Sequence, residues 1–565
     1  MVPHSVRAHV KEDALVTTYL EAATIKPVRP LADHETQSHE GGIVSKSDNW
    51  TRLNRFLILG TQGGSFYVGE RELSIENVGV VRACLDEDGS RTVGVIAAIS
   101  TEGRAPKNEP ALLALAMALR HPDVTTRRSA AAHFDDVVRT GTHLLHMAAY
   151  LKALGGGKKL TSRVIQRAFA NWFLSKTPDA LAYQAVKYQS RDGWALSDIL
   201  RQVHPKTGDP GLNAVMKWIV DGWTWEGTPL DKLGEWAHVP PVIRAKELIP
   251  RTEGEGRVRA AVTSIRETNL PREALPSELL NAPEVWAALL DGMPMTAMVR
   301  NLGKMTSVGL IDMGSEAARI VADRLGDVDR LRKARVHPLA LLVALKIYEQ
   351  GHGEKGSLKW TPVKKVITAL DEAFYLAFKT IEPTGKRIRL SVDVSGSMTG
   401  GQIAGMPGIS PRIGAAAMAL VTAATEPNAE IIGFATDLYE LGIRPSMRLD
   451  EVLRTIERLH NGQGTYCTHP IVEATKSGKT FDAFVSYTDS QTMDGAYGRG
   501  GYNGSVADAL TAYRLKTGVP ARHVVTAMAA NGISIADPND ALAMDIVGFD
   551  TATPAVIADF IAGRI

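Results

Sequence analysis

The chain has 565 residues, of which 44% are hydrophobic and 22% are charged, and its formal net charge at pH 7 is +2. This length exceeds what one hydrophobic core supports, so we expect two or more domains. No apolar run approaches the roughly 20 residues that cross a bilayer, and the start of the chain lacks the pattern of a secretory signal. The two cysteines, Cys84 and Cys467, are too few for a disulfide framework or for a four-cysteine or Cys₂His₂ zinc site. We therefore expect a soluble, cytoplasmic protein with no membrane partner.

Charge is divided unevenly along the chain. Residues 1–385 carry a net positive charge, whereas residues 386–565 carry a net negative charge. The basic excess is mild and does not by itself predict nucleic-acid binding, because solvated Lys and Arg cover most large helical proteins.

The part of the chain before residue 382 divides into an extension and a helical domain. Residues 1–47 show no sustained core pattern and are assigned to an N-terminal extension. Residues 48–381 are predicted to be almost wholly helical, because apolar residues recur at three- and four-residue spacing between short breaks. The clearest predicted helices cover Glu109–Leu119, Arg139–Leu154, Leu160–Leu174, Pro178–Tyr188, Leu196–Val203, Asp209–Val220 and Pro338–Tyr348. So many medium-length helices in series predict an α-solenoid, although no period defines a repeat unit.

Residues 382–565 change to strands and helices in alternation. The predicted strands cover residues 388–393, 429–434, 483–488 and 523–527, with a short strand near Ile546. The predicted helices cover residues 412–425, 449–460 and 505–516, with one more helix at the end. This order predicts a doubly wound parallel sheet, so the expected fold class is an α-helical array followed by an α/β domain.

The most informative motif lies where the first of these strands ends, in the sequence IRLSVDVSGSM from Ile388. The strand delivers Asp393, Ser395 and Ser397 to a turn at its C-terminal end, where open α/β sheets bind their ligands. A carboxylate and two hydroxyls suit a hard divalent cation, Mg²⁺ above all, with Mn²⁺ or Ca²⁺ as alternatives. Asp, Ser and Gly are also ordinary turn residues, so this turn alone leaves both interpretations open.

Two later segments favour the metal site. A Gly-rich turn presents the hydroxyl of Thr465, and another strand-like run ends in the carboxylate of Asp489. Parallel strands place their C-terminal ends on one edge of a sheet, so these oxygens can converge on one ion. The resulting set resembles the metal-ion-dependent adhesion site of von Willebrand factor A domains, with Asp393, Ser395, Ser397, Thr465 and Asp489 at the matching positions.

Other motifs resemble the Ro 60-kDa autoantigen family, which is built from a TROVE module and a von Willebrand factor A-like domain. They include MPMTAMVRNLGKMT from Met293, ARVHPLALLVALKIYEQGHGEKGSLKW from Ala334, EPTGKR from Glu382 and VDVSGSM from Val392. Upstream and downstream, NRFLILGTQGGSFYVGE from Asn54, AVKYQSRDGW from Ala185 and NGISIADPND from Asn531 fit the same family. The resemblance covers nearly the whole chain after the N-terminal extension.

This resemblance implies a monomeric ring of HEAT-like helical repeats closed against the A-type domain. It further implies that the ring holds small structured noncoding RNA, such as Y RNA, on its outer face. Single-stranded 3′ ends of misfolded RNA would pass through the central hole. Bacterial relatives are linked to exoribonucleases such as polynucleotide phosphorylase, which implies a part in RNA quality control.

Basic residues cluster in the segment that corresponds to the RNA-holding part of the ring. The cluster comprises Lys158, Lys159, Arg163, Arg167, Lys187, Arg191, Arg201, His204 and Lys206, with Lys152 beside it. Arg163 and Arg167 are four residues apart, so they share a helix face and could follow a run of phosphates. Tyr188 and Trp194 could stack on unpaired bases.

Without the resemblance, a solvated charged face and a core position for the two aromatic residues are the favoured interpretation. The resemblance reverses this preference for the basic cluster. One departure concerns Trp194-Ala195-Leu196-Ser197, where many relatives read Trp-Ser-His-Lys. A histidine and a lysine are thus absent from the expected RNA contacts.

Nothing in the chain predicts catalysis. No nucleophile and base stand out, and the acidic residues of the C-terminal domain do not form the carboxylate cluster of a two-metal nuclease. We therefore predict a protein that is not an enzyme. The leading function is an RNA-binding scaffold for noncoding RNA, and the alternative is a metal-dependent protein-interaction scaffold in which RNA binding is incidental.

Overall fold

The computed structural model describes most of the chain after Asn49. The described residues are 35–37, 43–45, 49–59, 79–102, 105, 107–155, 160, 162–222, 237–252, 254, 256–353, 356–403, 406–459, 465–489, 505–528, 536, 540–547 and 553–564. Within these ranges, no helix is both long enough and apolar enough to cross a membrane.

Helices make up almost all of the described residues from Asn49 to Thr380, as the sequence predicts. The first arm contains α2 (Asn49–Leu59), α3 (Gly79–Glu102), α4 (Glu109–Leu119), α5 (Val124–Ala132), α6 (Phe134–Val137), α7 (Gly141–Gly155), α8 (Arg163–Leu174), α9 (Pro178–Lys187), α10 (Leu196–Val203) and α11 (Pro210–Asp221). The second arm contains α12 (Pro241–Leu248), α13 (Gly256–Thr268), α14 (Pro283–Gly292), α15 (Met295–Ser307), α16 (Glu316–Leu325), α17 (Val328–Lys333), α18 (Pro338–Glu349) and α19 (Lys364–Leu376).

Short elements connect these helices. The 3₁₀ helices are η4 (Ile249–Arg251), η5 (Arg272–Ala274), η6 (Leu279–Asn281) and η7 (Ala377–Thr380). Two antiparallel strand pairs also occur, β1 (Glu35–Gln37) with β2 (Ile43–Ser45), before α2, and β3 (Ser190–Arg191) with β4 (Trp194–Ala195). Several helices begin with proline after a side chain that accepts a hydrogen bond from the first turn, as Thr177, Asp209 and His337 do for α9, α11 and α18. Proline suits this position because its missing N–H would have no partner there.

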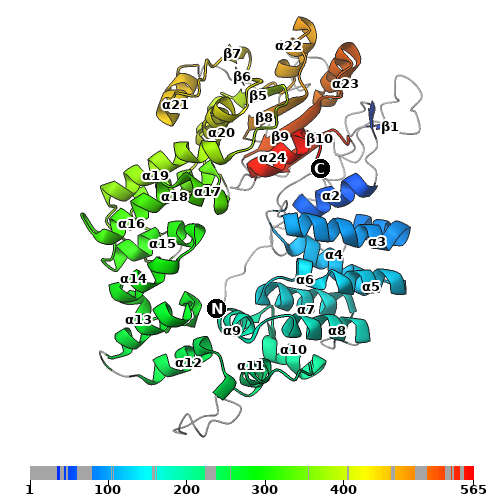
Figure 1. Ribbon diagram of the computed structural model, residues 1–565. Helices are drawn as coiled ribbons and strands as arrows, with labels where there is room; N and C mark the ends of the chain where they lie inside the picture. Colours follow the sequence, from blue (N-terminus) through cyan, green and yellow to red (C-terminus); the bar gives the residue numbers. More distant parts are fainter. Residues whose placement is uncertain are drawn as a thin grey trace, which may run out of the picture.

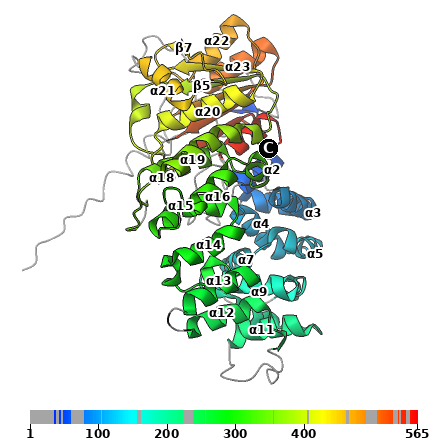
Figure 2. The same cartoon turned by 60° about the vertical axis from the view of Figure 1, so that its left-hand side comes forward.

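The helical array curves back on itself into a ring-like shape. Figure 1 shows the first arm descending from α2 to α11 and the second arm rising from α12 to α19, with the sheet domain across the top. Arg335, between α17 and α18, places Nη1 3.5 Å from the carbonyl oxygen of Glu102 at the end of α3, so the two arms meet across the ring. Figure 2 shows the sheet domain stacked on the end of the array that carries α18 and α19. The predicted fold class is confirmed.

The C-terminal domain is a six-stranded sheet with helices on both faces. Its strands are β5 (Ile388–Asp393), β6 (Ala429–Phe434), β7 (Leu438–Glu440), β8 (Ala483–Thr488), β9 (Arg522–Ala527) and β10 (Ala543–Val547). Their order is β10-β9-β8-β5-β6-β7, and every neighbouring pair is parallel except β6 with β7. Its helices are α20 (Pro411–Thr425), α21 (Leu449–Arg458), α22 (His469–Ser477), α23 (Val506–Thr517) and α24 (Thr553–Ile561), and η8 (Gly396–Thr399) follows β5. The doubly wound sheet is as predicted, whereas the short antiparallel β7 was not foreseen.

The sheet domain shares its main hydrophobic core with the array. Leu390 on β5 and Met418 on α20 belong to one continuous cluster of buried apolar residues that begins in the first helices. The opposite face of the sheet has a separate core under α22 and α23, to which Phe484 contributes. Glu426, just after α20, accepts hydrogen bonds from Thr384 N at 2.7 Å and from its hydroxyl at 3.1 Å. The link between the two domains is therefore held directly against the sheet domain.

Candidate functional site

The predicted metal loop lies at the carboxyl edge of the central strand. Asp393 ends β5 and is fully buried, with 0% of its surface exposed. Its Oδ1 accepts a hydrogen bond from the backbone N–H of Ser395 at 2.8 Å, and its Oδ2 accepts one from the Thr488 hydroxyl at 2.8 Å. The hydroxyl oxygens of Ser395 and Ser397 are 3.0 Å apart. One carboxylate and two hydroxyls thus occupy the same turn.

The other two predicted ligands lie at the same edge. Asp489 directly follows β8, which pairs in parallel with β5, and it is 9% exposed. Thr465 is 6% exposed, and the N–H of the next residue, Tyr466, donates to the carbonyl oxygen of Ala435 at 3.2 Å. Since Ala435 follows β6, Thr465 sits at the end of that strand. The loops after β5 and β8 and the segment between α21 and α22 therefore bring all five residues to one edge of the sheet.

The electrostatics of this edge fit a cation. The pKa of the Asp393 carboxyl is raised to about 6, mainly by burial; the nearby charge of Asp489 acts in the same direction, whereas hydrogen bonds from Ser395 and Thr488 act to lower the pKa. A divalent cation would offset this loss of solvation, and the available donors are the oxygen types that Mg²⁺ prefers. Among the described residues, no group of three or more His, Cys, Asp or Glu side chains is placed to hold a metal ion. A cation here would therefore depend on the hydroxyl oxygens as well as the carboxylates.

The predicted basic cluster lies on the first arm. Arg163 and Arg167 are both exposed on α8, which packs against α10, and Arg191 is exposed in the β3–β4 hairpin. Arg201, on α10, donates from Nη2 to the carbonyl oxygen of Val220 at 2.8 Å and so also braces the end of α11. Of the remaining described members, Lys187 is half-buried, and His204 and Lys206 are exposed. Lys158 and Lys159 lie outside the described residues.

The two aromatic residues proposed for base stacking occupy different environments. Trp194 is only 3% exposed, so its indole is part of the core and offers no free face to a base. Tyr188 is half-buried, and the Lys187 ammonium lies 5.4 Å from the centre of its ring. The core interpretation therefore holds for Trp194, and of these two residues only Tyr188 keeps exposed ring surface on which a base could stack.

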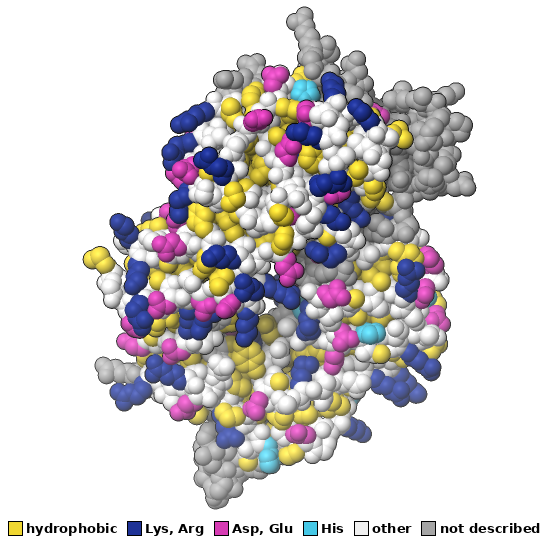
Figure 3. Space-filling model, turned by 45° about the horizontal axis from the view of Figure 1, so that its top comes forward, with side chains coloured by type: hydrophobic (Ala, Val, Ile, Leu, Met, Phe, Trp, Pro, Cys, Tyr) yellow, Lys and Arg dark blue, Asp and Glu magenta, His cyan; other side chains and the backbone are white. Residues whose placement is uncertain are grey.

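A second basic site, on the inner side of the ring, was not foreseen from the sequence. Figure 3 shows Lys and Arg side chains gathered around a central hollow. A groove of about 1210 Å³ opens here between the second arm and the sheet domain. The cations that line it are Arg272, Arg300, Lys304, Arg332 and Arg335, with Arg564 at the sheet domain.

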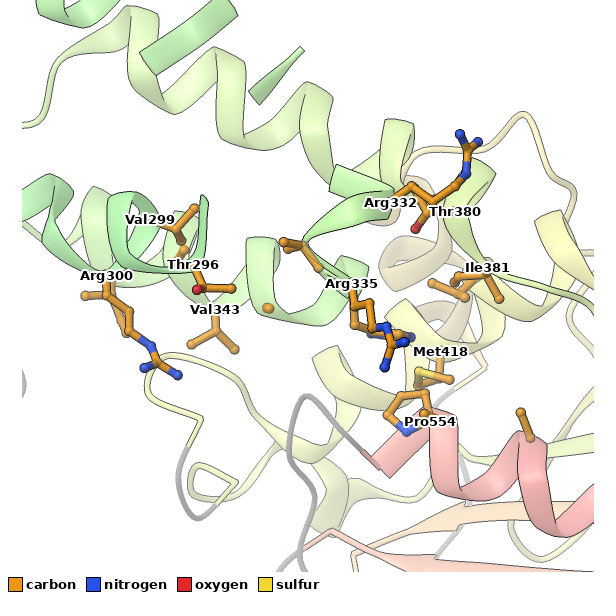
Figure 4. A pocket seen from close by; sticks show the side chains of 18 of the residues that line it. Thr296, Val299, Arg300, Arg332, Arg335, Val343, Thr380, Ile381, Met418 and Pro554 are labelled. Atoms are coloured by element: carbon orange, nitrogen blue, oxygen red, sulfur yellow. The ribbon is translucent and has the colours of Figure 1, made fainter. Parts of the chain in front are cut away.

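The cations of this inner groove are not equally available to a ligand. Nη1 of Arg272 donates to Asn301 at 2.9 Å, and Lys304 Nζ donates to Asn281 at 2.9 Å. Arg300 is exposed and makes no hydrogen bond or ion pair with the part of the chain that the structure describes. Figure 4 shows Arg300 extending from α15 and Arg335 reaching toward Met418 and Pro554. The sequence held one signal for this groove: Arg300 and Lys304 are four residues apart on α15, so they lie on the same face of that helix.

Apolar side chains line another part of the inner groove, which also contains the carboxylates of Glu382, Glu426 and Asp559. Val299 and Val343 line it from the array, and Ile381, Met418 and Ile557 line it from the linker and the sheet domain. A strip of cations beside an apolar wall suits an unpaired nucleic-acid strand, since phosphates and base faces need different surfaces.

Comparisons with known proteins agree with this architecture. The chain matches the family model described as TROVE domain over residues 36–221 and 265–347, and the one described as Ro60 vWA domain over residues 387–561. Two relatives are each named RNA-binding protein RO60. The one from Deinococcus radiodurans is 38% identical, over 95% of this chain and 97% of the relative. The one from Caenorhabditis elegans is 32% identical, over 96% and 92%, respectively.

A solved structure shows the same arrangement of domains. The crystal structure of the Deinococcus radiodurans RO (RSR) protein superposes with a TM-score of 0.82 at 36% sequence identity. The match covers 92% of this chain and 100% of that one. With both domains matched in order and two relatives above 30% identity over nearly their full lengths, the chain belongs to the Ro60 family.

Proposed function

We propose that this protein is an RNA-binding scaffold that holds small structured noncoding RNA, such as a Y RNA or a similar molecule. The observation that carries the proposal is the set of cations along the inner groove, in which Arg300 is exposed and makes no hydrogen bond or ion pair with the described residues. The names of the two RO60 relatives support RNA as the ligand class. Binding to phosphates would release counterions and so depend strongly on salt.

The two basic surfaces would take different parts of one RNA. The inner groove joins cations to an apolar wall, which favours a single-stranded end whose bases are free to stack. The outer cluster, with Arg163 and Arg167 on one exposed helix face, offers charge without an exposed tryptophan and suits the backbone of a folded region. The RNA would thus lie on α8 and α10 and send its 3′ end into the ring.

In this proposal the protein presents RNA and does not cut it. A single-stranded 3′ end held in the inner groove would be handed to an exoribonuclease, such as polynucleotide phosphorylase, in RNA quality control. The protein would work in the cytoplasm as a monomeric ring. Incubation of RNA with purified protein and Mg²⁺ should leave the RNA intact.

We also propose that the edge at Asp393 holds a divalent cation, most readily Mg²⁺. Asp393, Ser395, Ser397, Thr465 and Asp489 would supply the oxygen ligands. A bound cation would neutralise buried carboxylates and could accept an anionic oxygen from a partner.

The test of RNA binding uses protein freed of nucleic acid. Filter binding should show tighter binding of a hairpin RNA with an unpaired 3′ tail than of duplex DNA of equal length, with an affinity that falls steeply as salt rises. Equal affinity for the tailed hairpin RNA and the duplex DNA would contradict the proposal.

The metal edge supports a second candidate function, a metal-dependent protein-interaction scaffold. Its ligands lie at an edge of the sheet, separate from the residues that line the inner groove. Capture of a partner that survives ribonuclease treatment and is abolished by Asp393→Ala would favour this second function.

A further inference from the structure

A buried arginine lies directly beside the metal loop. Arg412 is the second residue of α20 and is only 6% exposed. Its Nη2 donates a hydrogen bond to the carbonyl oxygen of Ser395 at 3.2 Å. Its Nε is buried and has no hydrogen-bond partner among the described residues. An arginine is costly to bury in this way, so its position beside the loop calls for an explanation.

The charges that face Arg412 come from two elements. One is the carboxylate of Asp393, which is fully buried at the end of β5, two residues before Ser395. Glu457 faces it from α21, which packs against α20, and is exposed. Both carboxylates interact electrostatically with the guanidinium. Arg412 therefore interacts with the same carboxylate, Asp393, that would bind a cation.

The charge balance of the loop follows from these groups. Among the buried groups, with Asp393 and Asp489 ionised and Arg412 protonated, the loop carries one net negative charge before an ion enters; the charge of the exposed Glu457 is largely screened by water and is not counted. After a divalent cation enters, it carries one net positive charge. Because the side chains are largely buried, water screens this excess poorly.

We propose that Arg412 is a positioning and specificity-determining residue of the metal site. It holds the backbone of Ser395, and its charge lowers the affinity for a divalent cation until an anionic oxygen ligand joins the site. This inference rests on the proposed metal site. It makes occupancy by the ion depend on a carboxylate or another oxyanion from outside the chain.

The test is Mn²⁺ binding by isothermal titration calorimetry to the full-length protein, freed of metal and RNA. Arg412→Met, which keeps the length of the side chain without its charge, should bind Mn²⁺ about tenfold more tightly than the wild type. Arg412→Lys keeps the charge and should stay within about threefold of the wild type. Excess acetate should tighten Mn²⁺ binding by the wild type and by Arg412→Lys, and should have little effect on Arg412→Met.

A second variant covers the case in which Arg412→Met does not fold. Glu457→Gln changes only an exposed side chain, and it leaves Arg412 less neutralised, so it should weaken Mn²⁺ binding about twofold. Unchanged or weaker binding by a folded Arg412→Met, or equal behaviour of the Met and Lys variants, overturns the role of the charge. No Mn²⁺ binding by any variant overturns the inference together with the metal site. RNA binding by the same preparations separates that result from a failure of the RNA-binding function.

Discussion

The guanidinium of Arg448 lies over the ring of Tyr375, with Cζ 4.2 Å from the ring centre. The two residues belong to different domains, because Arg448 precedes α21 and Tyr375 is on α19. The Tyr375 hydroxyl also accepts a hydrogen bond from the backbone N–H of Leu449 at 3.0 Å, and Arg448 forms an ion pair with Asp371. The sheet domain is therefore fixed to the last long helix of the array.

Loss of this contact should loosen the joint between the domains. Arg448→Ala removes the cation over the ring and the ion pair, and we expect it to lower the free energy of unfolding by about 1 kcal/mol. Urea denaturation, followed by circular dichroism, measures the change. Arg454→Ala is the matched control, because Arg454 pairs with Asp450 on its own helix and makes no hydrogen bond or ion pair with the described residues of the array. Equal destabilisation by both variants would contradict the role of Arg448.

Gly303 should not tolerate a methyl group. A Cβ atom at this position would lie 2.7 Å from an atom of the Trp360 ring, which packs against α15. We expect Gly303→Ala to destabilise the protein by about 1–3 kcal/mol, because the indole must move. Gly94→Ala is the control, since Gly94 is exposed on α3 with nothing within 4 Å of the added carbon. This second variant should be neutral or stabilising by up to about 1 kcal/mol, as melting temperatures would show.

The buried histidine of β9 should make stability depend on pH. Burial, followed by the charge of Arg514, lowers the pKa of His523 from 6.5 to about 3. The unfolded chain therefore binds a proton more readily, so the contribution of His523 to stability is complete above pH 6.5 and is lost as the pH falls toward 3. At pH 5 the loss is about 2 kcal/mol. His523→Leu should show a smaller fall in urea midpoint between pH 7 and pH 5 than the wild type, and an identical fall would exclude this origin.

Arg300 should contribute one phosphate contact in the inner groove. Arg300→Ala should weaken binding of single-stranded RNA about tenfold and reduce the slope of log affinity against log salt by about one. Arg319→Ala is the control, because Arg319 is exposed on α16 and is paired with Glu316 and Asp323. If the two variants bind single-stranded RNA equally well, Arg300 does not contact it.

The outer cluster should act on folded RNA. A double charge reversal, Arg163→Glu with Arg167→Glu, should weaken binding of the hairpin RNA by about 100-fold or more, because attraction becomes repulsion at two phosphates. Binding of a short single strand in the inner groove should change much less. Gel-shift titrations with the two RNAs measure both effects, and an unchanged affinity for the hairpin would remove this surface from the site.

The parts of the fold that depend on local pattern could be predicted from the sequence. Strand β5 has the bounds expected from its apolar run, and the loop that follows it carries Asp393 to the sheet edge. The inner groove could not be predicted in the same way. Arg300 lies on α15 and Arg335 lies between α17 and α18. They line one groove only because the array bends, which no local period records. Trp194 failed as a stacking residue because composition does not reveal which face of a hairpin is covered.

The shared core and the Glu426 contact restrict the ways in which the ring could widen. A hinge between the domains would have to break the hydrogen bonds from Glu426 to Thr384 and separate apolar side chains such as Leu390 and Met418 from the core that they share with the array. The linker is thus a poor pivot. A wider central opening would instead require small rotations between many neighbouring helices, which add up along the array. A change in packing anywhere in the array would then alter the width of the opening.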